Sequence, residues 1–182
     1  MKAQMKNWII LFAVGLVISG CSVNVRTKYD QQVDFKQYKT YCWMDGCEFK
    51  ITGPAYLNDS LLQKNIKKAI VEELASKGLT EDISNPDLLV GFTITLKDEQ
   101  AIIYHPREDS PYYKPLDSER EVVNYLKGSL IIGMADKKES RIVWESFAVS
   151  YLELTPDFSE KNVRKGIKLV LKDFPPKKEE SK

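Results

Sequence analysis

The chain has 182 residues, and its 27 Lys and Arg against 26 Asp and Glu give a formal net charge of +1. This near-neutral balance argues against a nucleic-acid partner, which would select a clustered basic surface. The length is enough for one domain with a real core and too short for two comfortable ones.

The first 20 residues have the composition of a secretory signal. The segment contains two lysines near its start and no acidic residue. The apolar run Trp8–Ile18 is about 11 residues long, whereas a membrane-spanning helix needs roughly 20. We therefore expect residues 1–20 to be a signal peptide that is removed by cleavage between Gly20 and Cys21.

The end of this segment, Ile18-Ser19-Gly20-Cys21, resembles the lipobox of bacterial lipoproteins. Small side chains before the cysteine let the backbone lie extended in a peptidase, and the Cys21 thiol can form a thioether to a diacylglyceryl group. Cleavage then frees an amine for a further acyl chain, and two or three chains anchor a protein stably where one does so only marginally. This covalent diacylglyceryl and N-acyl lipid on Cys21 is the only non-protein group we expect, so no cofactor is predicted.

The residue after Cys21 is Ser22. In the enterobacterial lipoproteins that this segment resembles, an aspartate there favours retention at the inner membrane. Its absence predicts the outer membrane, with the protein facing the periplasm, and leaves display on the cell surface open. The mature 162 residues hold 25 basic and 26 acidic side chains and no second apolar stretch long enough to span a bilayer, so lipid would provide the membrane contact.

Two cysteines remain in the mature chain, Cys42 and Cys47, in a compartment where disulfides persist. If Trp43-Met44-Asp45-Gly46 forms a four-residue hairpin loop, the two cysteines lie opposite each other within disulfide reach. A two-residue loop on Asp45-Gly46 would instead put Cys42 out of register. We predict a structural disulfide first and free thiols next, because the tight C-x-x-C spacing of metal and redox motifs is absent.

The first half of the mature chain contains one strong helix pattern. Residues 22–28 alternate, as in a first strand or an extended tether, and residues 34–43 favour a strand towards their end. Ser60 and Gln63 fit a capping box at the start of an amphipathic helix, and Gly78 would end that helix.

The second half reads as strands followed by a helix. The predicted strands are residues 88–96, 124–135 and 141–154, the last two forming a hairpin. The last helix begins near Asp157, which with Glu160 would form a second capping box, and Pro175-Pro176 ends it. Residues 177–182 are expected to be a charged, disordered tail.

Residues 105–120 break the periodic pattern and contain three prolines, so we predict a loop or protruding arm there. Aromatic faces with hydrogen-bonding tips are typical of interfaces, and prolines reduce the entropy lost on binding. The candidate partner-binding residues of this arm are Tyr104, His105, Arg107, Tyr112 and Tyr113.

These elements predict an α+β fold with a mainly antiparallel sheet of four to six strands and two helices packed on one face. Residues 31–176 would form this single domain. Residues 21–30 would be the lipidated N-terminus and a tether.

Several landmarks occur in a characteristic order and spacing. They are the lipobox, residues 34–43 (DFKQYKTYCW), Lys77-Gly78-Leu79, Pro86-Asp87-Leu88-Leu89-Val90, Gly128-Ser129-Leu130-Ile131-Ile132, Ile142-Val143-Trp144-Glu145 and Phe174-Pro175-Pro176. In this order the chain resembles the bacterial lipoproteins that carry domain of unknown function 4136, over essentially the whole mature chain. It departs from them at a slightly displaced Asp136 and at Ser146, where a glycine is common. The resemblance implies an envelope location and a fold class, and it supplies no activity or catalytic residue.

The residues that could carry chemistry form no recognised constellation. His105 is the only histidine, no H-x-x-x-H, C-x-x-C or G-x-S-x-G spacing occurs, and paired carboxylates such as Glu72-Glu73 arise by chance among 26 acids. We therefore expect no metal site and no enzyme. The expected function is a lipid-anchored structural or interaction module with an envelope protein or glycan as partner. The alternative is a binding domain for a small molecule, lipid or glycan, with the sheet face or Trp144 lining a pocket, although Trp144 fits the core better.

Overall fold

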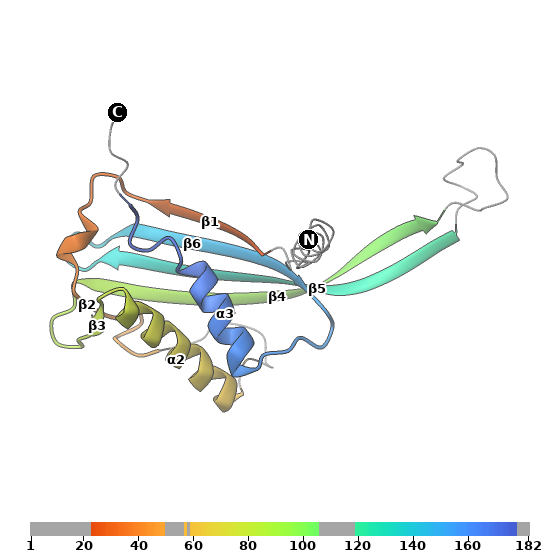
Figure 1. Cartoon of the computed structure of the whole chain (residues 1–182), viewed down its shortest axis with the longest axis horizontal. Coiled ribbons are helices and arrows are strands. Elements are labelled where there is room, and N and C mark those ends of the chain that lie inside the picture. Colours follow the sequence, from red (N-terminus) through yellow and green to blue (C-terminus); the bar gives the residue numbers. More distant parts are fainter. Residues whose placement is uncertain (1–22, 50–56, 58, 106–118, 178–182) are drawn as a thin grey trace, which may run out of the picture.

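The computed structural model describes residues 23–49, 57, 59–105 and 119–177, which form a sheet with two helices on one face (Figure 1). The helices are α2 (Ser60–Ser76) and α3 (Glu160–Val170), and a short 3-10 helix, η1, covers Phe35–Gln37. The strands are β1 (Asn24–Tyr29), β2 (Thr40–Trp43), β3 (Thr80–Glu81), β4 (Leu88–His105), β5 (Glu119–Asp136) and β6 (Arg141–Leu152).

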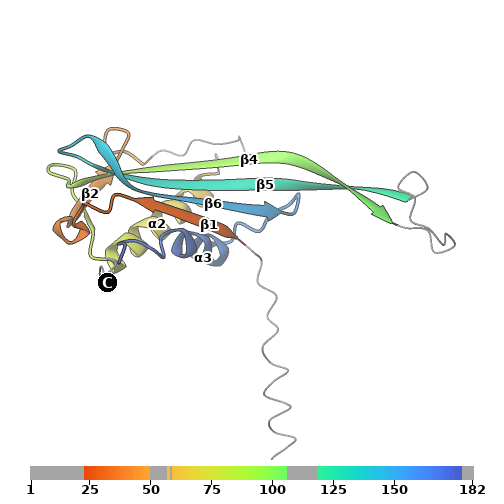
Figure 2. The ribbon, with the colours of Figure 1, turned by 90° about the horizontal axis from the view of Figure 1, so that it is seen from above.

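The strand order is β1-β6-β5-β4-β2-β3, and the pairings of β1 with β6, β6 with β5, and β5 with β4 are antiparallel. The α+β class and the two helices on one face are confirmed, as Figure 2 shows from above. The sheet is mixed, however, because β2 runs parallel to both β3 and β4. The reason is the connection: α2 carries the chain back along the sheet, and a crossover helix joins parallel strands.

The core lies between the sheet and the two helices. Alternate residues of β4 and β5 point into it, so that Val90 pairs with Met134 and Phe92 with Ile132. From the helices come the buried residues Leu62, Ile66, Ala69, Ile70, Leu74, Ile167 and Val170. Trp144 on β6 is fully buried, and its ring lies 5.3 Å from that of Phe174. Trp144 is therefore confirmed as a core residue and does not line a ligand pocket.

Both helices begin one or two residues away from the predicted caps. The N-cap of α2 is Asp59, whose carboxylate accepts hydrogen bonds from the amides of Leu61 and Leu62. Ser60 is thus already helical, since the aspartate just before it supplies the cap. At α3 the N-cap is Ser159, and Asp157 accepts its backbone N–H instead of capping the helix itself.

The ends of the domain also differ in detail from the prediction. Residues 24–29 form a full edge strand, in which Asn24 pairs with Val149 and Tyr29 with Trp144, so the folded part begins before residue 31. At the other end α3 stops at Val170, and turns then carry Leu171 and Phe174 into the core. Within the described residues, no helix is both long and apolar enough to cross a membrane.

Candidate interaction site

Strands β4 and β5 continue past the rest of the sheet as a two-stranded ribbon. We define the ribbon as Glu99–His105 paired with Glu119–Tyr125, in seven antiparallel pairs. Its neighbours stop earlier, because β6 pairs only as far as Leu126 and β2 contacts only the start of β4. At about 3.4 Å per residue the ribbon extends roughly 20 Å, and within the described residues it has no third strand (Figure 1).

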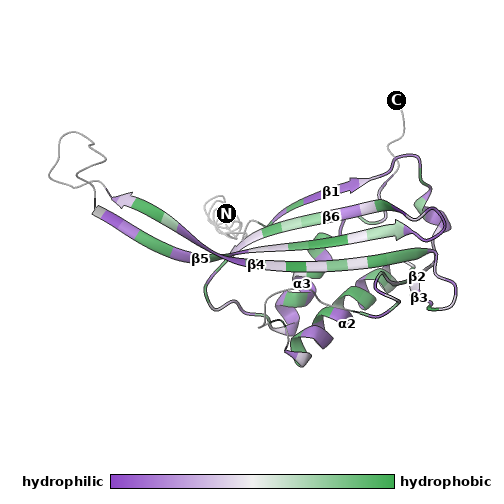
Figure 3. Cartoon of the chain, turned by 180° about the vertical axis from the view of Figure 1, so that it is seen from behind, coloured by the Kyte–Doolittle hydropathy of each residue, from purple (hydrophilic) through white to green (hydrophobic). Residues whose placement is uncertain are grey.

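Both strands of the ribbon contain hydrophobic residues (Figure 3). Ile102 and Val122 lie directly opposite each other, with exposed fractions of 54% and 56%. Ile103 and Tyr104 are each 43% exposed. Exposed β-branched residues on a free edge strand are a ready template for pairing with another chain, and soluble proteins normally avoid them.

Polar contacts hold the outer end of the ribbon in shape. The guanidinium of Arg120 lies 5.8 Å from the ring centre of Tyr104, in the geometry of a cation–π contact. His105 Nε2 and Glu121 Oε2 are 2.7 Å apart, and both side chains are more than half exposed. At the base, Tyr125 packs edge-on against Tyr151 of β6. The ribbon is thus ordered by its own side chains and presents them to solvent.

The predicted arm is partly corrected by this arrangement. Tyr104 and His105 belong to strand β4. All residues from 99 to 105 pair with residues 119–125, which lie beyond three prolines in the sequence. The other candidate residues, Arg107, Tyr112 and Tyr113, lie outside the described residues. Sequence reasoning missed Ile102, Val122 and Arg120, although the β-branched runs on either side of the prolines could have indicated a second, outer hairpin.

Cys42 and Cys47 are joined by a disulfide, with Cα atoms 4.9 Å apart. The predicted disulfide is therefore present, and the segment between the two cysteines is a tight turn in which the amide of Cys47 donates to the carbonyl of Trp43. Gly46 and Cys47 both have positive φ, which the Asp-Gly turn signal anticipates at the glycine. The bond ties this turn to the end of β2.

Reduction of this disulfide should lower the free energy of unfolding by about 2 kcal/mol, the chain-entropy value for so short a loop. The measurement is urea denaturation followed by circular dichroism, with and without reductant. The Cys42→Ala/Cys47→Ala variant provides the control, because reductant should leave its transition unchanged. A wild-type transition insensitive to reductant would contradict the prediction.

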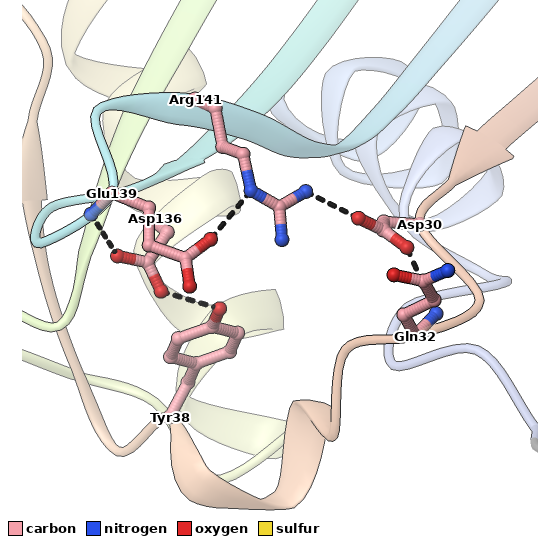
Figure 4. A network of polar contacts seen from close by, with 6 residues as sticks. All are labelled: Asp30, Gln32, Tyr38, Asp136, Glu139 and Arg141. Carbon is pink, nitrogen blue, oxygen red and sulfur yellow. Dashed lines mark hydrogen bonds and ion pairs between the residues drawn. The ribbon is translucent and has the colours of Figure 1, made fainter.

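A polar network closes the end of the sheet opposite the ribbon (Figure 4). Buried Asp136 accepts hydrogen bonds from Tyr38 Oη at 2.7 Å and from the Glu139 amide at 2.8 Å. Arg141 bridges Glu139 and Asp30, which joins the β5–β6 turn to the segment after β1. Burial, followed by the hydrogen bond to Asp136, raises the pKa of Tyr38 above its ordinary value. This network connects elements of the fold, and only its Asp30 also lies at the edge of a surface hollow.

Asp87 fixes the start of β4 in a similar way. Its Oδ2 accepts hydrogen bonds from the amides of Lys39 at 2.8 Å and Thr40 at 3.0 Å, across the parallel β2–β4 pair. The bond from Lys39 is the largest cause that lowers the pKa of Asp87. The Pro-Asp motif is therefore structural.

Two surface hollows lie among the described residues. One of about 600 Å³ lies at the N-terminal ends of α2 and α3, where Leu61, Leu126, Leu154 and Phe158 form an apolar floor beside Asp59 and Glu160. Another of about 630 Å³ lies around Phe35 and Pro175. Among the described side chains, no three His, Cys, Asp or Glu residues gather so that they could hold a metal ion.

The fold and the ribbon define the protein as an α+β domain with a protruding β-hairpin. The chain belongs to the family described as Domain of unknown function (DUF4136), whose model matches residues 25–176. No curated protein matches the chain in sequence.

Several solved structures are similar to this chain at low sequence identity. A PDZ domain protein from Parabacteroides distasonis has a TM-score of 0.53 and 23% identity over 87% of this chain, which spans only 36% of that protein. A DUF4136 family protein from Bacteroides thetaiotaomicron has a TM-score of 0.47 and 18% identity, covering 84% of this chain and 96% of its own. PelC from Paraburkholderia phytofirmans, a dodecamer, also has 0.47, at 10% identity over 82% of this chain and 95% of its own.

Proposed function

We propose that the protein is a lipid-anchored, non-enzymatic module of the cell envelope that binds a partner protein through the β4–β5 ribbon. The observation that carries the proposal is the ribbon itself, with Ile102 and Val122 exposed on paired strands that have no third strand among the described residues. The membrane attachment rests on the lipobox at Ile18–Cys21.

An isolated two-stranded hairpin is at best marginally stable in water. A ribbon of this length is therefore expected to gain stability from a further contact. An extended segment of a partner protein can provide that contact by pairing with a free edge strand. Main-chain hydrogen bonds would supply affinity in this mode. The alternating side chains Ile102, Tyr104 and Arg120 would supply specificity.

The anchor supports the same proposal by its position. Cys21 precedes Asn24, the first residue of β1, by three residues, which span at most about 10 Å. Asn24 pairs with Val149 near the end of β6, at the end of the sheet from which the ribbon leaves. A lipidated Cys21 would thus hold the base of the ribbon close to a membrane surface, within reach of other envelope proteins.

In-cell photo-crosslinking tests this function. A photoreactive residue at position 102 should give a discrete crosslinked species, whereas the same residue at position 142, equally exposed on β6 (Ile142, 58%), should not. The Ile102→Ser/Val122→Ser variant should lose co-purification of that species, because the apolar contacts of the free strands are gone.

The matched control is Ile83→Ser/Ile142→Ser, which removes two β-branched side chains of similar exposure away from the ribbon. Thermal unfolding of both variants should match that of the wild type, since surface substitutions rarely change stability by more than about 0.5 kcal/mol. Equal crosslinking from positions 102 and 142, or retention of the partner by the ribbon variant, would refute the proposal.

The hollow lined by Leu61, Leu126, Leu154 and Phe158 gives a second candidate function, the binding of a small apolar ligand. The ribbon variant leaves these residues in place. Native mass spectrometry of the purified protein would therefore separate the two functions, because a retained small molecule that is lost only on Leu154→Asp substitution would favour the ligand carrier.

A further inference from the structure

The outer face of α3 is a continuous basic stripe. Lys161, Arg164, Lys165 and Lys168 follow the spacing i, i+3, i+4 and i+7, which places them on one side of the helix, and Lys172 follows in the turn after it. The opposite side carries Ile167 and Val170, which are buried in the core. Two acidic residues flank the stripe: Glu160, the first residue of α3, and Asp173, whose carboxylate lies 4.0 Å from the Lys172 ammonium.

Most of these charges are not neutralised within the domain. Arg164 pairs with Glu72 at 2.7 Å and Glu160 at 3.2 Å. Lys161, Lys165 and Lys168 are exposed and have no ion pair with any described residue, and Lys64 of the neighbouring helix α2 is in the same state. Ordinary surfaces intersperse both signs, so a one-sided stripe favours an anionic counterpart.

We propose that this face of α3 docks on the anionic headgroups of the phospholipid membrane that holds the anchor, an inference that rests on the lipidation in the proposed function. Strand β1 starts within three residues of Cys21 and runs beside the C-terminal end of α3, where Thr27 Oγ1 lies 3.5 Å from Asp173 Oδ2. The tether is too short to lift the domain away from the bilayer. Basic side chains near the surface then interact with anionic lipid, at about 1 kcal/mol each.

Docking on α3 would set the direction of the ribbon. Seen from above, the helices lie on one side of the sheet, and the ribbon continues along the long axis of the sheet (Figure 2). With the helix layer against the membrane, the bare face of the sheet points away from it and the ribbon extends along the surface. The charge stripe thus orients the module, while the lipid retains it.

Amine-reactive labelling of the full lipidated chain on vesicles tests this arrangement. Lys161, Lys165 and Lys168 should react about fivefold more slowly on vesicles of phosphatidylglycerol in phosphatidylcholine than on phosphatidylcholine alone. An interaction of about 1 kcal/mol for each charge corresponds to this factor. About 1 M salt should abolish the difference, since the Debye length is then about 3 Å. Lys28, Lys97 and Lys127, which lie on the bare face of the sheet, are internal controls and should not change.

The variant Lys165→Glu/Lys168→Glu should remove the protection of Lys161, whereas Lys97→Glu/Lys127→Glu should keep it. Equal labelling on both vesicle types, or protection of Lys28 and Lys97 instead, would overturn the docking. Flotation with phosphatidylcholine vesicles distinguishes a failure of the lipid anchor from a failure of the docking of α3. A chain that fails to float lacks the anchor, whereas one that floats without protection of α3 keeps the anchor and lacks the docking.

Discussion

Replacement of Trp144 with alanine should lower the free energy of unfolding by about 3–5 kcal/mol, the range for a large aromatic side chain in a core. Trp144 has no exposed surface, and it packs edge-on against Phe174 from the segment that follows α3. Its strand position faces Met134 on β5 and Tyr29 on β1. The substitution therefore leaves a cavity where the sheet, the edge strand and the C-terminal segment meet.

Urea denaturation followed by circular dichroism measures this loss. The matched control is Phe147→Ala on the same strand, because Phe147 lies on the opposite face of the sheet and is 39% exposed. It should cost less than about 1 kcal/mol. Equal losses of unfolding free energy in the two variants would contradict the prediction that the buried Trp144 stabilises the packing of the helices on the sheet.

Local patterns predicted the elements that pack in the core. The helical spacing of Leu62, Ile66, Ile70 and Leu74 indicated α2 correctly, and the left-handed Gly78 ends it as expected. The alternation from Leu88 to Leu96 indicated the covered half of β4. In both cases burial on one face imposes a period that can be read from the sequence.

The same reasoning failed where no burial imposes a period. Beyond Leu96 the strand carries Asp98 and Gln100 on the side that faced the core, because the helix layer no longer covers it. The ribbon exists through pairing with residues 119–125, and the β-branched residues on either side of the proline-rich segment are only a weak local signal of that pairing. The candidate residues of the arm were therefore placed in a loop when two of them are in a strand.

Contacts distant in sequence were also out of reach. Tyr38 and Asp136 are 98 residues apart, and Asp136 attracted notice only as a displaced member of a family motif. The basic stripe of α3, in contrast, is a spacing that the sequence displays directly. Its meaning needed the structure, which shows that the stripe faces outwards and that the acids of neighbouring elements leave three of its lysines unpaired.

The Asp136→Ala variant should lose about 3 kcal/mol of unfolding free energy at neutral pH. Hydrogen bonds to a charged acceptor contribute about 1.5–3 kcal/mol each, and an unsatisfied buried donor adds a desolvation cost. The variant removes the acceptor of the buried Tyr38 hydroxyl and of the Glu139 amide. Tyr38→Phe, which removes only one of these bonds, should cost about 1 kcal/mol.

The pH dependence of this loss follows from the direction of the pKa shift. Burial acts to raise the pKa of Asp136, but the hydrogen bonds from the Glu139 amide and the Tyr38 hydroxyl outweigh it and hold the pKa below its ordinary value of 3.8. A carboxyl whose pKa is lowered by folding stabilises the native state above its ordinary pKa and loses that contribution as the pH falls through the folded value.

The difference in unfolding free energy between wild type and Asp136→Ala should accordingly be constant from pH 7 to about 5 and shrink below about pH 4. Chemical denaturation at a series of pH values measures it. Asp98→Ala is the control, since this exposed aspartate on β4 has no hydrogen bond to a described residue, and its difference from wild type should stay near zero throughout. If the difference in unfolding free energy instead grew as the pH fell, the folded protein would favour the protonated Asp136 carboxyl. The hydrogen bonds that Asp136 accepts as a carboxylate would then not be the source of its stabilising effect.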